Sequence, residues 1–348
     1  MNISGNKVIG EISALIDARL PSGWKKRSIG ARPDFILEIR EPGGKASRLI
    51  IKVKASVEPR DVPFLKEQLE AYLRAAGPGN TPLIVSSFLS RSVRQRLKEA
   101  GISYADSTGN LRIVSASPAL YIETPGDDRN PNRNERPARS LKGAKAGRIV
   151  RALCDNIPPF STRKLAESVG INAGYLSRVM GFLENEGVIE RRKRGPITVV
   201  RWRQLIERWA GDYSFSGSNR VVSFLEPKDI AALPQKLASA VKHLAITGSA
   251  AAATVAPVAP TRLISAYVES PEVVAQKLGL RPAESGANVL LAEPYDPLVF
   301  ERTRTVDGIP FAALSQVAVD LMTGPGRGPA EAQTLLDWMQ KNESDWRN

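Results

Sequence analysis

Two neighbouring groups of polar and basic side chains have the chemistry needed to bind duplex DNA. The first group opens a predicted helix over residues 173–186 and consists of Asn172, Gly174, Tyr175, Ser177 and Arg178. Short polar side chains and an arginine are residue types that hydrogen-bond base edges in the major groove. The opposite face of this helix repeats apolar residues three and four positions apart, at Leu176, Val179, Met180 and Leu183. One face can therefore pack on a core while the other meets DNA.

The elements around that helix predict a winged helix-turn-helix. Ser161 is a predicted N-cap for a short helix over 162–169, Gly170 suits the turn, and Asn172 can cap the next helix. An earlier helix begins near residue 144, and Pro158 and Pro159 interrupt the chain after it. Two β-prone runs then enclose a turn, and this predicts a basic wing with the cations Arg191, Arg192, Lys193 and Arg194.

The predicted contacts divide by the part of DNA that they reach. Thr162, Arg163 and Lys164 are expected at phosphates, and the cations of the wing are expected at the backbone or the minor groove. The group at the start of the 173–186 helix is expected in the major groove. Specific complexes of this kind usually use two half-sites, so we expect a homodimer on operator repeats.

The distribution of charge supports a polyanionic partner. The chain has 348 residues, with 49 Lys+Arg against 36 Asp+Glu and a net charge of +13. Residues 1–140 carry a net +8 and residues 141–210 also carry +8, whereas residues 211–348 carry 12 Lys+Arg against 15 Asp+Glu. A basic front half favours nucleic acid as the partner, and no basic amphipathic helix with an aromatic face points to a membrane surface.

Cysteine and histidine usage excludes several classes of site. With only Cys154 and His243, the chain can form neither an internal disulfide nor a zinc site built from several thiolates or imidazoles. Cys154 lies on an apolar helix face and is expected to be a small buried residue, and His243 is expected to be structural. The sequence contains no apolar span of 18 residues and no secretory signal pattern, so we expect a cytoplasmic protein without a membrane partner.

Composition and periodicity predict an α+β multidomain protein. We expect a first α/β domain over residues 1–123, a polar linker over 124–142, the helical DNA-binding domain over 143–210 and a C-terminal α+β domain over 211–348. Predicted helices and strands alternate in the first domain. In the last domain, helices are predicted over 228–241, 312–322 and 329–341, and strands over 221–225, 263–269, 289–292 and 298–302.

The first domain resembles the PD-(D/E)xK restriction-endonuclease-like fold. The resemblance covers about 100 residues and is carried by Pro33-Asp34, by Lys52-Val-Lys54, and by Gln68-Leu-Glu-Ala-Tyr72. It implies a metal-dependent nuclease site at Asp34, Lys52, Lys54 and Gln68. Lys52, however, stands where the family has a second metal-binding carboxylate, and a cation there removes a ligand and repels a divalent metal. We therefore interpret the site as vestigial, with lysines that can still contact phosphate. The alternative is that both lysines face solvent on an edge strand.

The glycine-rich segment Gly324–Pro329 is not expected to bind nucleotide. A phosphate-binding loop requires Lys-Ser/Thr after the last glycine, and the prolines here remove backbone donors. We expect no cofactor and no metal ion.

A second resemblance begins in the helical domain and continues to about residue 340. Thr247-Gly248, Asp320-Leu321 and the segment from Gly326-Arg327 to Glu331-Ala332 look like the pattern of AbiEi-type antitoxins of type IV toxin–antitoxin systems. The resemblance implies a transcriptional repressor that binds inverted repeats in its own promoter and counteracts a nucleotidyltransferase-like toxin. Shorter members of this family lack the nuclease-like domain that precedes the winged helix-turn-helix here.

Two alternatives to a DNA-binding regulator remain open at this point. One is a metal-dependent DNA nuclease of the PD-(D/E)xK type, targeted by the winged helix. The other is an antitoxin whose C-terminal domain binds the toxin directly. Metal-dependent plasmid cleavage would support the first, and co-purification of the toxin would support the second.

Overall fold

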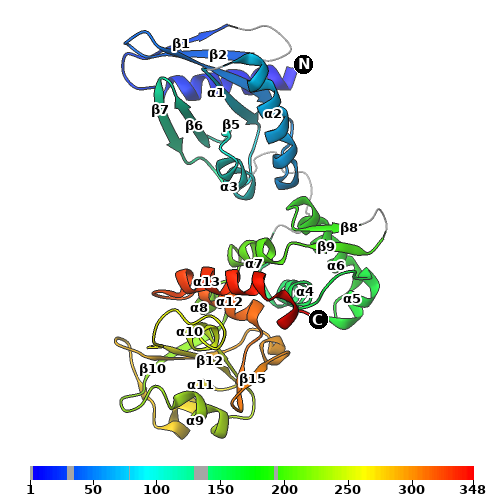
Figure 1. Ribbon diagram of the computed structural model, residues 1–348, viewed down its shortest axis with the longest axis vertical. Coiled ribbons are helices and arrows are strands. Elements are labelled where there is room, and N and C mark those ends of the chain that lie inside the picture. Colours follow the sequence, from blue (N-terminus) through cyan, green and yellow to red (C-terminus); the bar gives the residue numbers. More distant parts are fainter. Residues whose placement is uncertain (1–2, 30–34, 78, 129–139, 192–194) are drawn as a thin grey trace. The chain divides into compact units, whose positions relative to one another are not determined.

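The computed structural model describes residues 3–29, 35–77, 79–128, 140–191 and 195–348 (Figure 1). The chain forms two compact units. Residues 1–136 and 185–187 make up the N-terminal unit, and residues 137–184 and 188–348 make up the C-terminal unit.

A seven-stranded sheet organises the N-terminal unit, and its strands follow one another in sequence order. The pairings β3–β4 and β4–β5 are parallel, and the other four are antiparallel. The strands are β1 (Lys25–Ser28), β2 (Phe35–Arg40), β3 (Ala46–Val53), β4 (Asn80–Ser86), β5 (Ser103–Asp106), β6 (Leu111–Ala116) and β7 (Ala119–Thr124). The helices are α1 (Ile3–Asp17), α2 (Val62–Ala76) and α3 (Arg91–Glu99), with a short 3-10 turn η1 (Pro59–Asp61).

Helices cover both faces of this sheet because the buried strands are apolar on both sides. Ile12 and Ile16 of α1 pack with Leu49 and Leu83 on one face. Leu65 and Leu69 of α2 pack with Ile84 on the other. The predicted alternation of helices and strands is present in this domain.

Lys52 and Lys54 do not lie on an edge strand, so that alternative is wrong. β3 pairs with β2 on one side and with β4 on the other, and the Lys54 amide continues the ladder by donating to the carbonyl of Val85. β3 is therefore an interior strand. Helix α2 connects β3 to β4, and a crossover of this kind allows two consecutive strands to pair in parallel.

The C-terminal unit begins with three helices and a two-stranded antiparallel sheet. These elements are α4 (Ala144–Asp155), α5 (Thr162–Ser168), α6 (Ala173–Asn185), β8 (Ile189–Arg191) and β9 (Ile197–Val200). Phe160, between α4 and α5, exchanges two backbone hydrogen bonds with Ile197 and so extends this small sheet.

A second seven-stranded sheet follows, in the order β13-β10-β14-β12-β11-β16-β15. Its strands are β10 (Arg220–Leu225), β11 (Leu244–Thr247), β12 (Ile264–Val268), β13 (Arg281–Pro282), β14 (Val289–Glu293), β15 (Arg304–Val306) and β16 (Ile309–Phe311). The pairings β12–β14 and β11–β16 are parallel. The helical elements are α7 (Trp202–Ala210), α8 (Phe215–Ser218), α9 (Leu233–Ala240), α10 (Gly248–Ala252), α11 (Pro271–Leu278), α12 (Leu314–Met322) and α13 (Gly328–Lys341), with the 3-10 turns η2 (Pro297–Phe300) and η3 (Glu343–Asp345).

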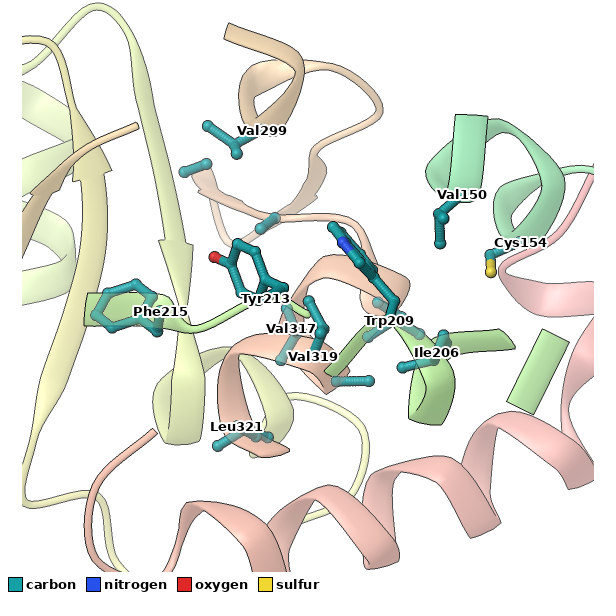
Figure 2. Packing of buried hydrophobic residues seen from close by; sticks show 14 of the residues in the cluster. Val150, Cys154, Ile206, Trp209, Tyr213, Phe215, Val299, Val317, Val319 and Leu321 are labelled. Carbon is teal, nitrogen blue, oxygen red and sulfur yellow. The ribbon is translucent and has the colours of Figure 1, made fainter. Parts of the chain in front are cut away.

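One hydrophobic cluster joins the three-helix part of this unit to the second sheet. It runs from Val150 and Cys154 of α4 through Trp209 of α7 to Val317 of α12 (Figure 2). Every residue of α12 from Leu314 to Leu321 is buried, so this helix lies at the centre of the unit. The three-helix part therefore does not have a core of its own, separate from the second sheet.

Two predicted elements of this region are wrong. The segment 298–302 is not a strand: Pro297–Phe300 forms a 3-10 turn, because the Asp296 side chain accepts a hydrogen bond from the Leu298 amide and Pro297 fits the first turn. The helix predicted over 228–241 begins only at Leu233. Asp229 caps the preceding turn by accepting hydrogen bonds from the amides of Ala231 and Ala232.

No helix in the described part of the chain is both long and apolar enough to span a membrane.

Candidate nucleic-acid interface

Three local features that the sequence predicted fix the start of α5 and the turn between α5 and α6. The Ser161 hydroxyl caps α5 by accepting from the Lys164 amide at 3.5 Å. Gly170 has a positive φ of 64°, which glycine adopts without the strain of a β-carbon. Asn172 Oδ1 accepts a hydrogen bond from the Tyr175 amide at 2.8 Å. These features fix the direction in which α6 leaves the turn.

The two faces of α6 separate as the periodicity predicted. Leu176, Val179, Met180 and Leu183 are buried. Asn172, Gly174, Ser177 and Arg178 are exposed, and Tyr175 is half-buried. The amino-terminal half of the helix therefore presents polar and basic groups to solvent over an apolar seat.

Arg178 lies over the ring of Tyr175. The guanidinium carbon is 5.8 Å from the ring centroid, within the range of a cation–π contact. The two residues are three positions apart on α6 and so project from the same side of the helix. The Tyr175 ring also packs against the hydrophobic cluster of the unit.

The polar residues of α5 lie beside this face. Arg163 and Lys164 are exposed and Thr162 is half-buried. The Arg163 guanidinium pairs with Glu167 one turn later, with an N–O distance of 2.9 Å. A shallow groove of about 660 Å³ runs between α5 and the start of α6, lined mainly by apolar groups with Thr162, Arg163 and Glu167 on its walls.

The hairpin β8–β9 follows α6, as predicted. Arg191 at its end pairs with Glu184 of α6 at 2.8 Å, and this contact ties the hairpin to the helix. Arg201, after β9, pairs with Glu190 of β8. The predicted contacts Arg192, Lys193 and Arg194 lie outside the described residues.

A chain of buried polar groups connects α4 to the C-terminal part of the unit. Arg151 of α4 donates from Nε to Asp155 at 2.8 Å and from Nη1 to Gln316 of α12 at 3.4 Å. Asp155 also accepts a hydrogen bond from the Ser315 hydroxyl. Charged side chains such as Arg151 and Asp155 are seldom buried unless they are paired. These contacts were not predicted, because residues about 160 positions apart leave no local signal.

Asp320 of α12 is the centre of this network. Its carboxylate accepts hydrogen bonds from Thr247 at 2.6 Å, from Tyr213 at 2.8 Å, from Tyr267 at 2.8 Å and from the amide nitrogen of Gln316 at 2.9 Å. Burial raises the pKa of Asp320 from 3.8 to about 6, although all four donors act to lower it. Burial also raises the pKa values of Tyr213 and Tyr267. Asp320 and Thr247 both belong to the motifs that carry the second resemblance. In the structure they are hydrogen-bonded to each other and buried.

The lysines of the first domain lie at the carboxyl end of β3. The Lys52 ammonium group donates to Gln68 Oε1 of α2 at 3.1 Å, so the structure brings these two predicted residues together. Lys54 is half-buried and directly follows Val53, the last residue of β3. Asp34 lies outside the described residues. No group of three or more His, Cys, Asp or Glu side chains with the geometry of a metal site occurs among the described residues.

Asp106 caps a turn. Its carboxylate accepts from the backbone amides of Thr108 at 2.9 Å and Leu89 at 3.0 Å and from the side-chain amide of Asn110 at 3.0 Å. The single histidine, His243, is exposed and contacts Glu269. The single cysteine, Cys154, is buried, as predicted. Burial raises the pKa of its thiol, which disfavours the reactive thiolate.

Comparisons with known proteins found matches for parts of the chain. No curated protein matches it. Two solved structures are similar over 30% of this chain: EndoMS in its apo form, 16% identical with a TM-score of 0.22, and the EndoMS-dsDNA2 complex, 15% identical with a TM-score of 0.21. The matched regions span 47% and 45% of those chains, less than half of their length. Residues 198–340 match the family model described as "Transcriptional regulator, AbiEi antitoxin, Type IV TA system", which confirms the predicted resemblance over this part of the chain.

Proposed function

We propose that this protein is a sequence-specific, double-stranded-DNA-binding transcriptional regulator that represses its own promoter as the antitoxin of a type IV toxin–antitoxin system. The observation that carries the proposal is α6, whose exposed start is polar and basic while its other face is fully buried. The match of residues 198–340 to a family of antitoxin regulators supports it. In this proposal α4, α5, α6 and the hairpin β8–β9 form a winged helix-turn-helix, the recognition helix being α6.

The proposed contacts follow from residue type and charge and, for the described residues, from exposure. Asn172, Gly174, Tyr175, Ser177 and Arg178 enter the major groove. Thr162, Arg163 and Lys164 contact phosphate next to it, and Arg191, Arg192, Lys193 and Arg194 grip the flanking backbone or minor groove. Phosphate contacts position the protein and base contacts select the sequence.

We propose a homodimer on an inverted repeat, because one α6 covers only a single half-site. The partner to be neutralised is a nucleotidyltransferase-like toxin. Residues 143–210 would be the DNA-binding domain and residues 211–348 the family-specific domain, joined by the core that both share.

Mapping of bound genomic fragments, followed by titration of the full-length protein against the recovered duplex and a scrambled duplex, tests this function. We expect the scrambled duplex to bind about a thousandfold more weakly, as is usual for specific regulators. Failure to bind any double-stranded probe at low ionic strength would refute the proposal.

For the N-terminal unit we propose a restriction-endonuclease-like domain whose site, at Asp34, Lys52, Lys54 and Gln68, is vestigial. The described side chains at this site do not supply the cluster of oxygen ligands that a divalent cation needs. Lys52 places an ammonium group against Gln68, where hard oxygen ligands would be needed, and it repels a metal ion. We therefore expect no cleavage of plasmid DNA with Mg²⁺ or Mn²⁺. Cleavage that Asp34→Ala abolishes would reverse this assignment and favour the nuclease alternative.

A further inference from the structure

The guanidinium group of Arg178 stacks on the ring of Tyr175, and that ring is partly buried. Tyr175 is half-buried and packs against the hydrophobic cluster of the C-terminal unit, whereas Arg178 is exposed. The guanidinium carbon lies 5.8 Å from the centre of the Tyr175 ring. Stacking on an anchored ring restricts the long arginine side chain before DNA arrives, so the conformational entropy cost of binding is smaller.

Arg178 also differs from the other arginines around α6 in its charge partners. Arg163 pairs with Glu167, Arg191 with Glu184 and Arg201 with Glu190. Arg178 makes no ion pair with any residue in the part of the chain that the structure describes. Its donors are therefore not engaged by a carboxylate of this region.

The other residues at the start of α6 offer less discrimination between bases. Asn172 uses its side-chain oxygen to cap the helix, and this bond restricts the orientations in which it can present a donor–acceptor pair to adenine. Gly174 has no side chain, and the Ser177 hydroxyl can either donate or accept. Selection by hydrogen bonding at this part of α6 thus depends mainly on Arg178.

The guanidinium group carries donors only, and two of them point in the same direction. In the major groove guanine presents two adjacent acceptors, N7 and O6, whereas adenine pairs an acceptor with a donor and cytosine presents a donor. We infer that Arg178 reads a guanine in each half-site through N7 and O6, and that Tyr175 is the positioning residue that holds the guanidinium group for this contact. This inference rests on the proposed DNA-binding function and names the base that it recognises.

The test uses the full-length protein and the tightest duplex recovered from a random pool. Each guanine of the half-site is replaced in turn by 7-deazaguanine, which lacks the N7 acceptor, and affinity is measured by fluorescence anisotropy. For the wild type, one such replacement per half-site should weaken binding about tenfold. The same replacement should have no effect on Arg178→Ala, since alanine has no donors to place at N7 and O6.

Tyr175 is tested with two variants and a matched control. Tyr175→Phe keeps the ring and should retain the response to 7-deazaguanine, whereas Tyr175→Leu should reduce that response severalfold. A melting scan of each variant separates this effect from unfolding, because Tyr175 contacts the core. The control Arg163→Ala removes a proposed phosphate contact, so it should weaken binding to every duplex while the fold change caused by 7-deazaguanine stays as in the wild type.

The outcomes separate this inference from the function on which it rests. Sequence-specific binding with an equal response of wild type and Arg178→Ala to every 7-deazaguanine overturns the guanine assignment and leaves the regulator intact. An unchanged response of Tyr175→Leu overturns the positioning role alone. Absence of binding to all duplexes overturns the proposed function itself.

Discussion

Arg151 of α4 and Gln316 of α12 are hydrogen-bonded inside the C-terminal unit, although 165 residues separate them in sequence. Gln316 accepts from Arg151 through its oxygen and donates to Asp320 through its nitrogen, at 2.9 Å. One amide therefore connects a buried cation on the first helix of the proposed DNA-binding domain to a buried carboxyl group of the family-specific domain. Both domains share a polar network as well as a hydrophobic core.

Removal of the buried cation should destabilise the protein strongly. Arg151→Ala leaves Asp155, whose side chain is only 4% exposed, without its ionic partner. Breaking a buried ion pair from one side typically costs about 3–5 kcal/mol. We expect a decrease of this size in the free energy of unfolding, measured with urea. The control is Arg163→Ala. Arg163 is exposed and pairs with Glu167 four residues later, the same spacing as between Arg151 and Asp155. Its replacement should lower the free energy of unfolding by less than about 1 kcal/mol. Equal decreases for the two variants would contradict a buried network.

Asp320 should make stability fall as pH rises through the weakly acidic range. Its pKa is raised to about 6 in the folded state from an ordinary value of 3.8, so the folded protein holds this proton more tightly than the unfolded chain. Its contribution is therefore fully present below pH 3.8 and is lost between about pH 4 and pH 6. The unfolding free energy of the wild type, relative to that of Asp320→Asn, should fall by about 1–3 kcal/mol over this range. The exposed control Asp307→Asn should keep the wild-type pH profile, and parallel profiles for wild type and Asp320→Asn would rule out the buried carboxyl as the cause.

The cap of α6 should be separable from DNA contact at the same position. Asn172→Ala removes the acceptor for the Tyr175 amide and should cost about 1 kcal/mol of stability. Asn172→Asp restores a capping oxygen and should recover stability, but its negative charge should weaken binding to every duplex through repulsion by phosphate. Thermal unfolding and anisotropy of both variants check this. Tight DNA binding by Asn172→Asp would place this residue away from the DNA.

The cations of the wing should contribute affinity without sequence preference. Replacement of Lys193 and Arg194 by alanine should weaken operator and scrambled duplexes alike. It should also reduce the slope of log affinity against log salt by about 0.9 for each phosphate that the variant no longer neutralises. Titrations at several salt concentrations measure the slope. Arg281→Ala, an exposed cation of β13, is the control and should leave the slope unchanged. Weakening confined to the operator would instead assign base reading to the wing.

Local features of the proposed interface could be predicted from the sequence alone. Ser161, Gly170 and Asn172 act within three residues of their own positions, and the apolar stripe of α6 depends only on helical periodicity. The same rules gave wrong results at residues 298–302, where β-prone side chains follow an Asp-Pro pair that starts a 3-10 turn. They also missed the hairpin β15–β16, whose three-residue strands are too short to show alternation.

The amino-acid sequence by itself determined where α5 and α6 begin, which face of α6 is apolar and where positive charge gathers, because these properties depend on neighbours a few residues apart. Tertiary structure alone decided that Lys52 donates to Gln68, that Arg191 pairs with Glu184, and that Gln316 joins Arg151 to Asp320. These contacts join residues on different elements or depend on which rotamer packing permits. Their free energy arises only when burial removes water from charged and polar groups that the folded chain brings together.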